Sequence, residues 1–94
     1  MTAHLCTVDG IEPEEVIPIG DHWTFAEICN LLDAEILEQV ETVDDRVMFV
    51  DQFGVDRHKQ RNPIATLYAY GFGGQRMIVG DALMMGSTEE CTVS

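Results

Sequence analysis

The stretch Arg46-Val47-Met48-Phe49-Val50-Asp51 decides the fold of this chain, and the turn-like residues Gln52-Phe53-Gly54 follow it directly. Four consecutive apolar residues, two of them β-branched, are typical of a buried strand. Gly54 can adopt the positive φ that often closes such a strand. The pattern therefore predicts a strand over residues 46–51.

The same stretch divides the chain by charge. Residues 1–45 contain twelve Asp or Glu and no Lys or Arg, whereas residues 46–94 contain five acidic and five basic residues. The net charge of −12 therefore comes entirely from the first half. This balance opposes non-specific binding to nucleic acid or to an anionic membrane, and we expect neither as a direct partner. It favours a basic protein partner, a cation, or solubility alone.

Length and composition indicate one domain spanning residues 1–94, since 46% of the residues are apolar and can build a core. The cysteines at positions 6, 29 and 91 are widely spaced and form no C-x-x-C motif, which is typical of reduced thiols inside a cell. The first residues lack the pattern of a secretory signal, and no apolar run exceeds four residues. We expect a soluble, cytoplasmic protein.

Two extended segments and a helix precede the central stretch. Residues 4–8 predict a first strand and residues 15–19 a second, which Pro18 restricts to a sheet edge or a strand end because proline donates no ladder hydrogen bond. Thr24 and Glu27 have the spacing of a capping box, and Trp23 and Ile28 have that of a hydrophobic staple. These signals predict a helix over residues 25–33.

The segment before the central strand fits two structures. Its apolar residues have helical spacing, so the preceding helix could continue, but the β-branched residues towards Val43 favour a strand over residues 37–43. Asp44-Asp45 then turns the chain into the central strand and forms a hairpin.

Downstream of Gly54, a basic run at residues 57–61 is expected to pair with the acidic half, within the molecule or across a dimer. Asn62 can cap a helix that begins at Pro63, but residues 64–70 fit a helix or a strand equally well. Residues 71–74 predict a turn, residues 77–79 a strand and residues 82–85 a final buried element. The polar residues 87–94 predict a frayed tail.

These elements together predict an α+β fold. We expect an antiparallel sheet of four to five strands with one main helix, about residues 25–33, packed on one face. The open edges of such a small sheet would allow a homodimer.

Residues 23–86 resemble a family of small phage- and plasmid-borne proteins that is known only as domain-of-unknown-function family 3846. The resemblance is carried by Leu37-Glu38 with Val40, Val50-Asp51-Gln52-Phe53-Gly54, Asn62-Pro63-Ile64-Ala65-Thr66 and Ile78-Val79-Gly80-Asp81-Ala82-Leu83. Asp33-Ala34-Glu35 stands where the family has paired glycines. The resemblance implies an origin in a mobile element and a compact α+β fold. It brings no established activity, so no catalytic residue is carried over.

The residue patterns predict no catalytic group, metal site or cofactor. His4 and Cys6 would share one face of a strand, but the close pairs that a zinc site prefers are missing. No local signature joins a cysteine to a base. The glycines at 71, 73 and 74 lack the Lys-Ser/Thr of a P-loop, and a turn explains them.

Three functions remain open. The first is a non-enzymatic accessory protein of a mobile element that binds a basic partner through acidic side chains expected to be exposed. Extended residues two apart lie about 6.8 Å apart, close to two phosphate steps along one DNA strand, so such an acidic face can imitate nucleic acid. The partner-binding residues would be Glu12, Glu14, Glu15, Asp21, Glu27 and Asp33. The second is a small-molecule- or metal-binding enzyme with a pocket near Asp51, Asn62 and Asp81. The third is a structural or self-assembling module.

Overall fold

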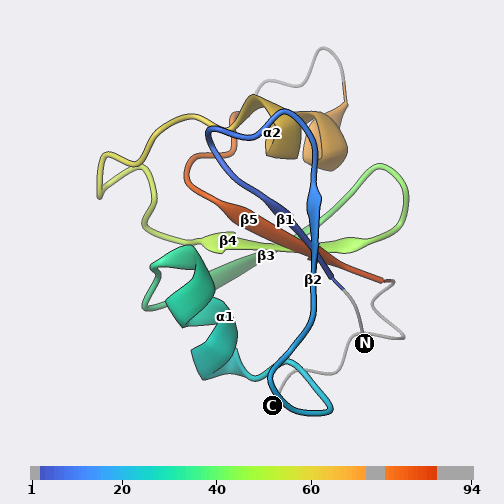
Figure 1. Ribbon diagram of the computed structural model, residues 1–94. Helices are drawn as coiled ribbons and strands as arrows, with labels where there is room; N and C mark the ends of the chain where they lie inside the picture. Colours follow the sequence, from blue (N-terminus) through green and yellow to red (C-terminus); the bar gives the residue numbers. More distant parts are fainter. Residues whose placement is uncertain (1–2, 72–75, 87–94) are drawn as a thin grey trace.

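The computed structural model describes residues 3–71 and 76–86, and it shows a five-stranded antiparallel sheet with one helix on each face (Figure 1). The predicted α+β class is confirmed. In chain order the elements are β1 (Ala3–Cys6), β2 (Glu14–Val16), α1 (Phe25–Leu32), β3 (Leu37–Glu41), β4 (Val47–Asp51), α2 (Pro63–Tyr70) and β5 (Ala82–Met85). Over these ranges we find no helix with the length and apolarity that crossing a membrane requires.

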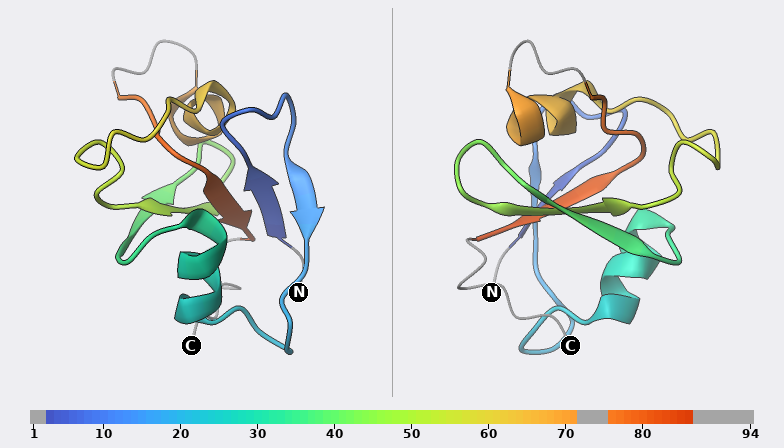
Figure 2. Two further views of the ribbon diagram at one scale, coloured as in Figure 1. Left: turned by 60° about the vertical axis from the view of Figure 1, so that its left-hand side comes forward. Right: turned by 180° about the vertical axis from the view of Figure 1, so that it is seen from behind.

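The strand order is β2-β1-β5-β4-β3, and every neighbouring pair is antiparallel. The last strand in the sequence, β5, therefore lies in the middle of the sheet, between β1 and β4. All residues of β4 and β5 are buried, whereas β2 and β3 form the two edges (Figure 2). Because both faces of the central strands are covered, their sequences are continuously apolar rather than alternating.

Helix α1 covers one face of the sheet. Its Ile28 and Leu32 pack in a cluster with Val47, Phe49 and Leu83, which point to this side of β4 and β5. The Oγ1 of Thr24 accepts the backbone N–H of Glu27 at 3.1 Å, which is the N-cap half of the predicted capping box. The carboxylate of Glu27 accepts the backbone N–H of Ile19. The helix ends at Asp33, whose φ of 51° is left-handed.

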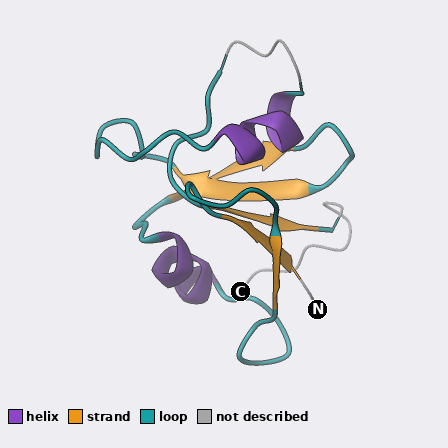
Figure 3. Ribbon diagram, turned by 45° about the horizontal axis from the view of Figure 1, so that its top comes forward, coloured by secondary structure: helices purple, strands orange, loops and turns teal. Residues whose placement is uncertain are grey.

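Helix α2 covers the opposite face, as Figure 3 shows. Its Ala65 and Ala69 pack in a second cluster with Met48, Val50 and Met84, which alternate along the strands with the residues that face α1. The sequence of residues 64–70 fits either a helix or a strand. Asn62 caps the segment as a helix and Pro63 occupies its first turn, so the fold contains a second helix beyond the one expected.

The prediction of a strand at residues 77–79 is wrong. Val79 forms only an isolated bridge with Arg61, and Ile78 pairs with no strand. The backbone N–H of Ile78 donates to Thr66 Oγ1, and its carbonyl accepts the N–H of Asn62, each at 2.8 Å. These bonds to α2 and its cap replace a sheet ladder. Residues 72–75 of the expected turn and the expected tail at 87–94 lie outside the described residues.

Candidate functional site

The acidic residues proposed for partner binding follow the β2 edge of the sheet. Glu12 precedes the strand, Glu14 and Glu15 belong to it, and Asp21 lies in the loop that leads to Glu27 of α1. Within β2, Val16 packs on the α1 side, so Glu14 shares that side and Glu15 points to the α2 side. Glu14 and Glu15 therefore lie on the edge strand and point to opposite faces, while Glu12, Asp21 and Glu27 lie in the segments before and after it.

Asp33 differs from these residues. It lies at the far end of α1, where its carboxylate is 3.4 Å from the guanidinium of Arg57. The structure therefore separates Asp33 from the β2 edge and neutralises part of its charge.

Four of the five basic residues form ion pairs with carboxylates outside the β2 edge. Arg46 pairs with Asp44, Arg76 pairs with Glu38, and Arg57 and Lys59 both pair with Asp51. Among residues 3–71 and 76–86, no Lys or Arg lies within 4 Å of a carboxylate between Asp9 and Glu27. Among the described residues, these carboxylates thus form no ion pair with a Lys or Arg.

Asp51 is the buried centre of a charge network whose other members are partly exposed. Its side chain is 1% exposed, and one carboxylate oxygen lies 3.0 Å from Arg57 and 2.9 Å from Lys59. The other oxygen accepts the backbone N–H of Phe53 at 2.9 Å. Burial alone would raise the pKa of Asp51, but the hydrogen bonds from Lys59 and Phe53 and the two positive charges together lower it.

The same two cations bind the carboxyl end of α1. Lys59 Nζ donates to the carbonyls of Leu32 and Asp33, at 2.9 and 2.6 Å, and Arg57 also donates to the Asp33 carbonyl. Cations are favourable there because the last carbonyls of a helix are unpaired and carry partial negative charge. The predicted pairing of the basic run with the acidic half is therefore confirmed within one molecule, at Asp33.

Asn62, which the sequence predicts as a pocket residue with Asp51 and Asp81, is fully buried, and all its side-chain polar atoms are hydrogen-bonded within the protein. Its Nδ2 donates to the carbonyls of Cys6 and Gly80 at 2.9 Å, and its Oδ1 accepts the N–H of Ala65 at 3.1 Å. Asn62 thus joins β1, α2 and the segment before β5, and its side chain keeps no free polar atom for a ligand.

Asp51 and Asp81 line different cavities. Asp51 borders a cavity of about 100 Å³ together with Arg76, whereas Asp81 borders one of about 200 Å³ together with Lys59. One oxygen of Asp81 also accepts the N–H of Val8 at 3.0 Å. The two carboxylates therefore do not converge on a shared ligand.

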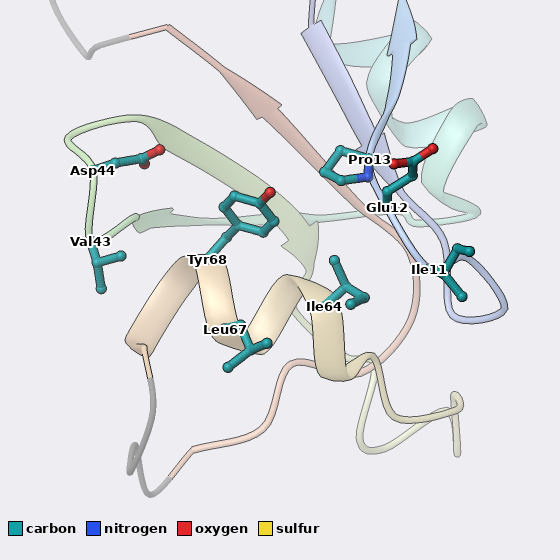
Figure 4. Close-up of a pocket in the computed structure, with 8 residues that line it drawn as sticks. All are labelled: Ile11, Glu12, Pro13, Val43, Asp44, Ile64, Leu67 and Tyr68. Carbon is teal, nitrogen blue, oxygen red and sulfur yellow. The ribbon is translucent and has the colours of Figure 1, made fainter.

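A larger apolar cavity of about 370 Å³ lies between the loop before β2, the β3–β4 turn and α2; we call it the loop–helix groove (Figure 4). Its walls are Ile11, Glu12, Pro13, Val43, Asp44, Ile64, Leu67 and Tyr68. Ile11 is 88% exposed, and the guanidinium of Arg46 lies 5.3 Å from the ring centroid of Tyr68. The groove thus combines exposed apolar side chains with Glu12 of the acidic edge.

A second apolar cavity, of about 420 Å³, lies between the chain after β2 and α1; we call it the strand–helix groove. Its walls are Val16, Ile17, Ile19, Trp23, Glu27, Asn30 and Leu31. Ile17 is 70% and Ile19 94% exposed. The carboxylate of Glu27 accepts the N–H of Ile19 at 2.8 Å and so holds this wall to α1.

Sequence reasoning missed both grooves. The available signal was that Ile11, Ile17 and Ile19 are apolar residues inside an acidic, proline-broken segment. That signal marks exposed apolar side chains but does not reveal which helix lies beside them.

The two described cysteines, Cys6 and Cys29, are buried and have raised pKa values. Burial raises the pKa of the Cys6 thiol to about 11, against a smaller lowering by Arg46, and burial also raises the pKa of Cys29. A nucleophilic cysteine needs a lowered pKa instead. Within the described ranges, no three His, Cys, Asp or Glu side chains are grouped so that they could hold a metal ion.

The resemblance to family 3846 stays a prediction. Comparison of the chain with protein-family models, with curated proteins and with solved structures finds no match.

Proposed function

We propose that this chain is a non-enzymatic accessory protein that binds a basic partner protein through the acidic edge formed by Glu12, Glu14, Glu15, Asp21 and Glu27. One observation carries the proposal: these carboxylates have no Lys or Arg within 4 Å in the described structure, while four of the five basic residues are paired elsewhere. Its link to a mobile element rests on the resemblance to family 3846.

Unneutralised carboxylates on one edge produce a local negative potential, which attracts cationic surfaces and repels nucleic acid. Such attraction acts over about one Debye length, roughly 10 Å at 0.1 M salt, so it should weaken as salt is added. The competing explanation is that the charges only maintain solubility and keep the edge strand from pairing with other chains.

The enzyme hypothesis has no comparable support. Asp51 is held by Arg57 and Lys59, and the polar side-chain atoms of Asn62 are bonded within the protein. A structural or self-assembling role would appear as a large assembly of the purified chain in light scattering.

Two variants of equal charge test the binding proposal. In the edge variant, Glu12, Glu14, Glu15 and Glu27 become Gln, which keeps an oxygen to accept the Ile19 N–H. In the control variant, Glu35→Gln, Glu41→Gln, Asp45→Asn and Asp56→Asn remove four exposed carboxylates elsewhere. Both variants and the wild type are used to capture proteins from a host lysate at moderate salt, and each captured protein is then purified and titrated.

We expect a basic protein that binds the wild type and the control variant, binds the edge variant at least about tenfold more weakly, and loses affinity as salt rises. Equal binding by the edge variant and the control variant, or capture of no basic protein, would contradict the proposal.

A further inference from the structure

Strand β2 has an unused backbone edge. It pairs with β1 on one side, and among the described residues Glu14, Glu15 and Val16 form no other backbone pairing. A strand with one neighbour leaves a row of N–H and C=O groups free, and this row is a template for one more strand.

The two apolar grooves meet this edge at its opposite ends and on opposite faces of the sheet. The loop–helix groove begins at Ile11 and Pro13, before β2, and lies on the α2 side. The strand–helix groove begins at Val16 and Ile17, at the end of β2, and lies on the α1 side. The three isoleucines at positions 11, 17 and 19 leave 70–94% of their surface in solvent, which favours covering them with apolar side chains.

The charges on β2 restrict what can pair with it. Glu14 and Glu15 point to opposite faces, so each face of an added strand would meet a carboxylate. Opposite charges across a strand pair are stabilising and like charges are destabilising. A second copy of this chain also carries a net charge of −12, which disfavours edge-to-edge pairing between copies.

We propose that an extended, cationic segment of a partner protein adds to β2 as a sixth strand and places one apolar side chain in each groove. This inference rests on the proposed function and specifies its binding mode. Side chains of a strand alternate between faces, so anchors for grooves on opposite faces must be separated by an odd number of positions. Lys or Arg residues between the anchors would face Glu14 and Glu15.

An array of synthetic peptides tests the proposal on the full chain. Each peptide has about twelve residues, enough to span the roughly 26 Å from Ile11 to Ile19 if extended. Two leucines are placed four to eight positions apart, and Lys, Arg or Thr fill the remaining positions. Because Trp23 is the single tryptophan and lines the strand–helix groove, its fluorescence reports binding.

We expect spacings of five and seven to bind at least about tenfold more tightly than spacings of four, six and eight. Hydrogen exchange at the β2 amides should slow in the bound state, because free backbone groups become paired. Ile11→Ser and Ile19→Ser should each weaken binding about tenfold, whereas Ile36→Ser, at a residue 46% exposed beside β3, should leave it unchanged.

Three results would overturn strand addition: no binding by any cationic peptide, equal binding at odd and even spacings, or binding with unchanged exchange in β2. Peptides that bind the wild type without the spacing preference or the slowed exchange in β2, but do not bind the four-Gln edge variant, would leave recognition by the acidic residues standing. Only the proposed binding mode would then be wrong. If the edge variant binds as well as the control variant, the proposed function itself fails. Dimerisation of the peptide-free chain with slowed β2 exchange would identify a second copy as the occupant.

Discussion

The ammonium of Lys59 lies 2.9 Å from a carboxylate oxygen of Asp51 and also donates to the carbonyls of Leu32 and Asp33. One cation thus fixes the last residue of β4 to the last turn of α1. Arg57 joins the same contact, so both cations are paired with Asp51 and the end of α1 rather than with a carboxylate of the β2 edge.

Asp51→Asn should destabilise the protein by about 2–4 kcal/mol. The substitution leaves Lys59 and Arg57 without their buried partner, and the loss is smaller than for a fully buried pair because Arg57 is 41% exposed on its side chain. Urea unfolding measures the change. The matched control is Asp56→Asn, at an exposed residue without an ion pair among the described residues, which should alter stability by less than about 0.5 kcal/mol. Equal effects of the two substitutions would refute the role given to Asp51.

The contribution of Asp51 should depend on pH. Its pKa in the folded protein lies below the ordinary value of about 3.9, so folding favours the charged form. The stabilisation is then fully present above about pH 4 and is lost as the pH falls through the folded pKa. The difference in unfolding free energy between wild type and Asp51→Asn should therefore be smaller near pH 3 than near pH 6. A constant or larger difference at low pH would show that the pKa is not lowered.

Asn62→Ala should lower the free energy of unfolding by about 2–4 kcal/mol, which is more than the loss of an exposed helix cap lowers it. It removes the cap of α2 and also leaves the carbonyls of Cys6 and Gly80 buried without the Asn62 donor. Thr24→Ala removes the cap of α1 at an exposed position and should cost about 1 kcal/mol. Chemical denaturation of both variants measures the two losses of stability. If Asn62→Ala loses no more stability than Thr24→Ala, the hydrogen bonds from Asn62 to Cys6 and Gly80 contribute nothing beyond the helix cap.

Gly80→Ala should destabilise the protein by about 1–2 kcal/mol, since Gly80 has a φ of 79° that a side chain disfavours. An added Cβ would also lie 2.8 Å from Lys59 Cδ and push the stem of that lysine. Gly20→Ala is the control, because Gly20 has no positive φ and no atom within 4 Å of an added Cβ. Thermal unfolding should show a lowered Tm for the first variant only; an equal Tm for both would contradict this reading of Gly80.

The elements that were predicted correctly are those whose signals lie close together in the chain. Thr24 and Glu27 are three residues apart and define the start of α1 without help from the rest of the molecule. The apolar run of β4 likewise indicates its own burial. Residues 77–79 look equally strand-like, but the N–H of Ile78 donates to Thr66 and its carbonyl accepts from Asn62, so the prediction there was wrong.

The candidate site was predicted only in part. The acids of the β2 edge could be named from charge and turn patterns, but Asp33 was grouped with them although it pairs with Arg57 at the other end of α1. The grooves were not predictable, because their walls come from segments as distant as Ile11 and Tyr68.

The sequence by itself determined the α+β class, the cap of α1, the burial of β4 and the concentration of acid in the first half. These follow from periodicity, capping and composition, which depend on neighbouring residues. Tertiary structure decided the place of β5 between β1 and β4, the partners of the basic residues and the unneutralised β2 edge. The physical reason is that these depend on contacts between distant segments, such as Asn62 with Cys6, 56 residues apart, and Lys59 with Leu32, 27 residues apart.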